Sequence, residues 1–177
     1  MNTKAIHCLT LFFLIGSLSV HSQIFMGKQK KADKATKQYR YDIECVGTGK
    51  KDQKLIKVWS YSKKPKYAIS QSWKNAVHGI IFKGFAGVGR TCTGFRPLMN
   101  KQMTKEQYDT FFEDFFLDSG DYSQYVSDAD DGLINPEDVL KVDRRMYKIG
   151  VVVNVNVGEL RKRLIKEGLI NGLATGF

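Results

Sequence analysis

The side chains that most often carry chemistry in proteins are scarce in this sequence. Its histidines and cysteines are His7, His21, His78, Cys8, Cys45 and Cys92. Nucleophilic catalysis needs a Ser or Cys held against a base, and the sequence has no Gly-x-Ser-x-Gly elbow. Zinc needs three or four suitably spaced ligands, which one His and two distant Cys beyond the N-terminal segment do not supply. The sequence therefore favours a protein that is not an enzyme and needs no metal or other cofactor.

Two loops share features with ligand-binding motifs but depart from them at the positions that matter. Residues 84–97 are rich in glycine, follow a predicted helix and lack the Gly-Lys-Ser/Thr ending of a phosphate-binding loop, so we interpret them as a mobile connector. In the acidic segment 127–138, with Gly132 at the turn, the first and third calcium ligands would be Ser127 and Ala129. That departs from the EF-hand pattern, and a weak surface calcium site stays open only as an alternative.

Cys45 and Cys92 are the cysteines that remain beyond the N-terminal segment. A disulfide between them would close a loop of about 47 residues and stabilise the fold by about 4 kcal/mol in the chain-entropy model. Cys45 also lies on the inward face of a predicted strand, where a buried free thiol is equally compatible with the pattern. The sequence leaves both states open.

Residues 1–22 have the layout of a secretory signal peptide. Lys4 gives a positive start, Ile6–Ile15 is mostly apolar, and a small, polar end follows. The apolar run is too short to span a bilayer, and Cys8 lies inside it rather than after it, which argues against a lipid anchor. We expect cleavage before Gln23, no transmembrane segment in the mature chain, and a location in the periplasm or at the outer membrane or cell surface.

The chain is basic, and its charge is unevenly placed. Residues 23–101 hold 18 basic and four acidic residues, whereas residues 102–177 hold nine basic and 14 acidic ones. Residues 28–40 hold six basic residues, one acidic residue and no apolar periodicity, and we therefore expect residues 23–38 to form a flexible, solvated tail. The alternative is an electrostatic arm for an anionic partner, and export argues against nucleic acid in that role. The contacts of such an arm would be Lys28, Lys30, Lys31, Lys34, Lys37 and Arg40.

Hydrophobic periodicity predicts the strands. Alternating apolar residues over 40–61 predict a β-hairpin, and residues 139–143 predict a short, weak strand. Residues 146–157 predict a long strand that buries its odd-numbered side chains.

The helices follow from apolar stripes at helical spacing. A stripe from Ile69 to Ile81 predicts a helix that starts near Pro65 and ends near Gly84. Its polar side holds His78, which we therefore expect to be an ordinary surface residue. The other members of that side are Ser70, Gln71, Lys74 and Asn75.

Two further helices are predicted in the second half of the chain. An aromatic stripe within residues 104–118, opened by a capping pair, predicts a helix whose rings belong to the core. Residues 159–167 predict a closing helix with leucines inward and Arg and Lys outward.

The predicted order of elements is β-β-α-α-β-β-α. This order indicates an α+β fold with one largely antiparallel sheet of about four strands and two or three helices on one face. The sequence has no internal repeat. It therefore predicts a single domain over residues 39–177, after the signal peptide (1–22) and the basic segment (23–38).

The segments VWSYSKKPKYAISQSWKNAVHGIIFKGFAG and MYKIGVVVNVNVGELRKRLIKEGLI resemble a family of small exported proteins of uncharacterised function from Bacteroidota-type bacteria. The resemblance covers most of residues 39–177, and Gln23 after the cleavage point is similar to many exported proteins of that group. More distantly, the helix with Ala68 and Ala76 and the late valine-rich strand resemble envelope-assembly modules, namely the N-terminal domain of the flagellar assembly protein T and curli-secretion-related lipoproteins. The lipidation cysteine of those modules is missing, and neither resemblance implies functional residues.

The signal peptide, the missing catalytic residues and the concentrated positive charge together predict a function. We expect a non-enzymatic, exported cell-envelope protein that binds another macromolecule, as an assembly or accessory component does. The partner would be an envelope protein or an anionic envelope polymer. The alternative is a secreted binding module for an anionic glycan or small ligand.

Overall fold

The computed structural model describes residues 40–47, 49–50, 52–64, 67–99, 105–117 and 120–172, with side chains from residue 110 onward in the helix that begins at 105. The predicted signal peptide (1–22) and basic segment (23–38) lie outside the described residues. The same holds for five of the predicted anion contacts, Lys28, Lys30, Lys31, Lys34 and Lys37.

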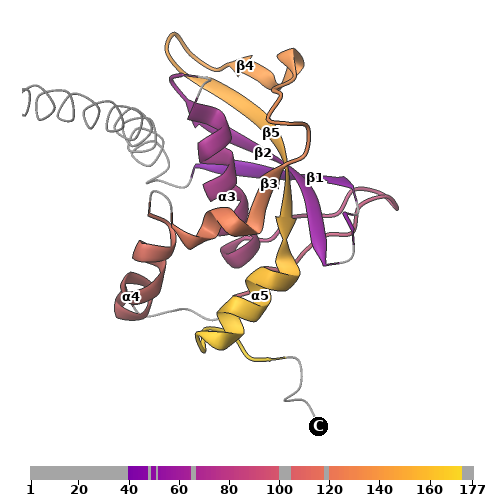
Figure 1. Cartoon of the computed structure of the whole chain (residues 1–177). Helices are drawn as coiled ribbons and strands as arrows, with labels where there is room; N and C mark the ends of the chain where they lie inside the picture. Colours follow the sequence, from indigo (N-terminus) through magenta and orange to yellow (C-terminus); the bar gives the residue numbers. More distant parts are fainter. Residues whose placement is uncertain are drawn as a thin grey trace, which may run out of the picture.

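An antiparallel sheet of five strands lies at the centre of the described part (Figure 1). The strands are β1 (Tyr41–Gly47), β2 (Gln53–Ser62), β3 (Val126–Asp128), β4 (Val139–Lys141) and β5 (Tyr147–Asn156). Their order is β1-β2-β5-β3, and β4 also pairs with β5. The predicted hairpin is present as β1 and β2, and the α+β class with a largely antiparallel sheet is confirmed.

The long ladder between β2 and β5 forms the middle of the sheet, and side chains along it point alternately to the two faces of the sheet. It runs from the Gln53–Asn156 pair to the Ser62–Tyr147 pair. Ile149, Val151 and Val153 on β5 are at most 1% exposed and lie on what we call the inner face. The predicted burial of the odd-numbered side chains of this strand is therefore confirmed.

Helices pack against the inner face. They are α3 (Ala68–Phe82), α4 (Lys105–Phe115) and α5 (Val157–Lys166), with the short 3₁₀ helix η2 (Asp121–Tyr125). A second 3₁₀ helix, η3 (Pro136–Asp138), lies on the opposite face, where Asp138 is close to Gly150 of β5. In Figure 1, α3 crosses the sheet while α4 and α5 lie toward one end of it. Phe112, Phe115 and Phe116 are buried in the core, as the aromatic stripe predicts.

The observed order contains one strand more than predicted, β-β-α-α-β-β-β-α. The additional strand is β3, whose last two residues fall in the segment that we expected to be a polar loop. Three residues are too few to display the period-two alternation that reveals a strand. Pairing with β5, rather than its own composition, makes this segment extended.

The prediction that the polar side of α3, with His78, lies at the surface is wrong. Gln71, Lys74 and Asn75 are at most 4% exposed, and His78 is half-buried. The reason is that α3 lies between the sheet and the aromatic rings of the α4 and η2 region, so that more than one side of the helix is covered. Gly79 allows α3 to lie close to β1, because a Cβ at this position would be 2.1 Å from Cδ1 of Ile43 on β1.

Candidate functional site

The glycine-rich connector folds back on itself beside β1. Residues 85–95 form a short two-stranded ribbon, which we call the ribbon. Phe85 and Phe95 exchange two backbone hydrogen bonds of 2.9 Å, and Val88 and Cys92 exchange two of 2.9 and 3.3 Å. The rings of Phe85 and Phe95 also stack, with centroids 5.9 Å apart. The connector therefore has a defined shape and extends beside β1 in Figure 1.

Three glycines explain why this segment can fold so tightly. A Cβ on Gly87 would lie 2.6 Å from the backbone nitrogen of Gly94, and a Cβ on Gly94 would lie 2.8 Å from that of Gly87. Gly89 has a φ of +57° at the turn, a conformation that favours glycine. The glycine content that suggested a connector is thus a requirement of the ribbon.

A disulfide between Cys45 and Cys92 joins the ribbon to the edge strand β1. The two Cα atoms are 6.0 Å apart, a separation that is ordinary for this bond. Cys92 is only 2% exposed although most of the ribbon around it is exposed. The ribbon is therefore held to the sheet at a single covalent point.

The ribbon exposes its turn, which carries Arg90, and two further basic residues flank the ribbon. We call Val88–Thr91 the ribbon tip; Val88 is 58% exposed there, and Arg90 is exposed as well. Residues 83–99 include Lys83, Arg90 and Arg96 but no Asp or Glu. Sequence reasoning did not identify this surface. A cysteine and three basic residues within an acid-free, glycine-rich segment were the available signal.

Arg40 is the one predicted anion contact within the described residues, and it lies elsewhere. Its guanidinium carbon is 4.2 Å from the ring centroid of Tyr61, at the end of β1 opposite Cys45. The neighbouring Lys148 pairs with Asp42 at 2.8 Å. Arg40 therefore lies on the outer face of the sheet near the Lys148–Asp42 ion pair, and not on the ribbon.

A groove lies at the opposite edge of the sheet. It encloses about 490 Å³ between the segment 130–138 and the outer face of β5. We call it the edge groove; it is lined by Asp130, Leu133, Ile134, Asn135, Pro136, Asp138, Gly150 and Val152. Asp138 is held by Lys57 at 2.8 Å, whereas Leu133 is 77% exposed. The groove thus combines apolar walls with carboxylates.

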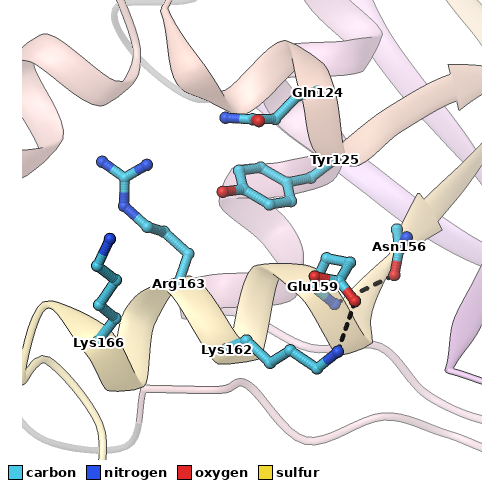
Figure 2. A pocket seen from close by; sticks show the side chains of 7 residues that line it. All are labelled: Gln124, Tyr125, Asn156, Glu159, Lys162, Arg163 and Lys166. Atoms are coloured by element: carbon cyan, nitrogen blue, oxygen red, sulfur yellow. Dashed lines mark hydrogen bonds and ion pairs between the residues drawn. The ribbon is translucent and has the colours of Figure 1, made fainter.

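A second pocket of about 330 Å³ lies between η2 and α5 (Figure 2). The side chains of Gln124, Tyr125, Arg163 and Lys166 border one open region of it in Figure 2, whereas Lys162 points elsewhere. Arg163 is bound at 2.8 Å by the carboxylates of Asp121 and Glu167. The basic side of α5 that the sequence predicts is therefore present, but carboxylates already balance part of its charge.

Two titratable groups on α3 are unusual. Burial, together with the positive charge of Lys83, lowers the pKa of His78 to about 3. Nδ1 of His78 lies 2.7 Å from the hydroxyl of Tyr41, and its ring is 4.8 Å from that of Phe82, centroid to centroid. Burial also lowers the pKa of Lys74 to about 8. These groups pack within the core, so we assign them to the fold rather than to a site.

The described residues contain no group of three or more His, Cys, Asp or Glu side chains that could hold a metal ion. Within the same residues, no helix is both long enough and apolar enough to cross a membrane. Three comparisons, with protein-family models, with curated proteins and with solved structures, found no match for this chain.

Proposed function

We propose that this protein is a non-enzymatic component of the cell envelope that acts by binding another macromolecule through the ribbon. One observation carries the proposal. The ribbon is joined to β1 by the Cys45–Cys92 disulfide, exposes Arg90 at its tip and contains no acidic residue, and Lys83 and Arg96 flank it. Such a surface suits an anionic partner.

Preorganisation is the physical argument for a binding role. A free loop loses conformational entropy when it binds, and a covalent link made beforehand reduces that loss. Arg90 at the tip adds long-range attraction toward acidic surfaces, which speeds association and selects partners. A single basic tip with an exposed valine fits a protein surface better than a uniform polymer, because it offers both an apolar and a charged contact.

Export is part of the proposal, and two observations support it. Residues 1–22 have the sequence pattern of a signal peptide. The disulfide between Cys45 and Cys92 fits an oxidising compartment, where such bonds form and persist. Detection of the chain in the envelope fraction with Gln23 at its N-terminus would support this part, and a retained Met1 in the exported protein would contradict it.

A second candidate function has its own observation. The pocket beside α5 brings together Arg163, Lys166 and the Tyr125 hydroxyl, groups that donate hydrogen bonds to anions (Figure 2). This arrangement favours an anionic glycan or small ligand. The carboxylates already bound to Arg163 weaken the argument, so we rank this candidate second.

Equal charge reversals at the two surfaces separate the candidates. We expect wild-type protein and Lys166→Glu to be crosslinked to the same protein partner in envelope preparations, and Arg90→Glu to lose at least nine-tenths of that product. Protease treatment of the envelope should abolish binding, whereas a glycan hydrolase should not. The proposal fails if Arg90→Glu binds as wild type. The second candidate replaces it if Lys166→Glu alone loses binding and the glycan hydrolase removes the partner.

A further inference from the structure

The two edges of the sheet expose apolar side chains. The strand order places β1 at one edge, and β3 and β4 on the far side of β5. Six large apolar residues are exposed in the described part of the chain, and five of them lie at these edges. Val46 and Val88 belong to the β1 edge, and Leu133, Leu140 and Val142 to the other edge. Exposed apolar side chains that gather in this way are typical of interaction surfaces.

The segment that forms the ribbon and the segment that lines the edge groove differ in charge, although β1 itself carries Asp42 and Glu44. Residues 83–99 hold three basic residues and no acidic one, whereas residues 128–138 hold five acidic residues and no basic one. Arg90 at the ribbon tip and Asp130 in the edge groove are both exposed. Neither of them forms an ion pair with another described residue.

We propose that the ribbon tip of one copy of this protein docks into the edge groove of a second copy. Val88 would meet the apolar wall at Leu133, and the Arg90 guanidinium would pair with the carboxylate of Asp130. The inference rests on the proposed function, because it names a second copy as the partner of the ribbon. The groove, at about 490 Å³, has the size of pockets that take a few side chains.

The contact must form between copies rather than within one. Three inter-strand spacings separate β1 from β3, about 14 Å at about 4.8 Å each, and the disulfide holds the ribbon at β1. Because the two surfaces differ, the contact is heterologous, and each docked copy still offers a free ribbon or a free groove. Such contacts build open chains or closed rings. The protein would thus form the repeating unit of an assembly.

Sedimentation of the purified protein from micromolar to millimolar concentration tests the proposal. We expect the average mass of wild type to rise with concentration at low salt and to fall when salt is added, since an exposed ion pair is screened. Arg90→Glu alone and Asp130→Arg alone should associate at least tenfold more weakly. An equal mixture of the two should associate as wild type does, because each chain then offers the charge that the other lacks. Lys63→Glu, an equal charge reversal at an exposed lysine outside both surfaces, serves as the matched control and should leave association unchanged.

The outcomes separate this inference from the proposed function. A wild-type protein that stays monomeric at every concentration overturns the inference, and so does a mixture of the two reversed chains that fails to associate. If Arg90→Glu loses its envelope partner while Asp130→Arg keeps it, the ribbon binds a different macromolecule and only the proposed function survives. Circular dichroism and the melting temperature of each variant show that a loss of association is not a loss of folding. If a reversed chain is unfolded, Arg90→Gln and Asp130→Asn should each still weaken association, because each removes one charge of the pair.

Discussion

The helices α3 and α5 have similar sequence patterns and different surroundings. Both carry an apolar stripe with polar residues opposite. On α5 the stripe is buried through Leu160 and Leu164 at 0% exposure, while Lys162 and Lys166 are exposed. On α3 the polar side is buried as well. Periodicity therefore shows which residues must be buried, whereas the elements that surround a helix decide which other residues are buried.

Most of the buried polar residues of α3 have hydrogen-bond partners, which makes their burial tolerable. Asn75 donates to the hydroxyl of Ser60 at 2.8 Å, and Gln71 donates to the carbonyl of Tyr61 at 3.4 Å. Their own side-chain oxygens have no hydrogen-bond partner among the described residues. A buried side-chain amide whose NH₂ group is hydrogen-bonded but whose oxygen is unpaired lowers the stability of the fold.

At neutral pH, the largest effect should come from Gln71→Glu on α3. The substitution keeps the shape of the side chain but places a carboxylate at a site that is 1% exposed, next to a carbonyl oxygen. An uncompensated buried charge is strongly destabilising, so we expect a loss of about 3 kcal/mol at neutral pH. Chemical denaturation measures it. The loss should shrink at low pH, where the carboxyl group is protonated.

Gln124→Glu is the matched control for this substitution. Gln124 is exposed and lies beside the basic side of α5 (Figure 2). The same change of charge there should leave stability within about 0.5 kcal/mol of wild type. Equal losses at both positions would show that the polar side of α3 is not buried as described.

The next effect is a dependence of stability on acid pH caused by His78. Burial lowers the pKa of His78 in the folded protein to about 3, from 6.5 in the unfolded chain. As the pH falls from 6.5 toward 3, the unfolded state takes up a proton that the folded state does not. Stability should therefore decrease by up to about 1.4 kcal/mol per pH unit, with no contribution above pH 6.5.

His78→Phe removes this titration and keeps a ring among Phe82 and Phe116. The difference in stability between wild type and this variant should change across the acid range. A difference that stays constant from neutral to acid pH would mean that His78 titrates normally and that its ring is open to water.

Two lysines give the next contrast. Burial lowers the pKa of Lys74 on α3 to about 8, whereas a hydrogen bond from Lys162 on α5 to Glu159 raises the pKa of Lys162. Between pH 8 and 10.5 the unfolded chain holds a proton that folded Lys74 releases, so Lys74 makes the protein more stable as the pH rises through this window. Lys74→Met should remove that rise, and Lys162→Met should keep it. The measurement is the melting temperature of each variant against pH.

Much of the fold could be predicted from the sequence, because long periodic segments report their own burial. The hairpin, β5 and the three helices are of this kind. β3 could not be predicted, since three residues show no period and only β5 makes them extended. The ribbon depends on contacts between Gly87 and Gly94 and on the disulfide, and the edge groove depends on β3 and β4 pairing with the same strand. Surfaces assembled from distant segments leave no local pattern to read.

The last contrast removes one asparagine hydrogen bond at each helix. Asn75→Ala deletes the buried bond to Ser60, leaves a small cavity and should cost about 2 kcal/mol. Asn156→Ala deletes an exposed cap at the start of α5, where Oδ1 accepts from the backbone N–H of Glu159 at 3.1 Å, and should cost about 1 kcal/mol. Asn156→Asp should recover most of that loss because a carboxylate also caps a helix start, whereas Asn75→Asp should worsen the loss at α3 by burying a charge. If both aspartate variants behave alike in denaturation experiments, the surroundings of the two helices do not differ in the way that the structure describes.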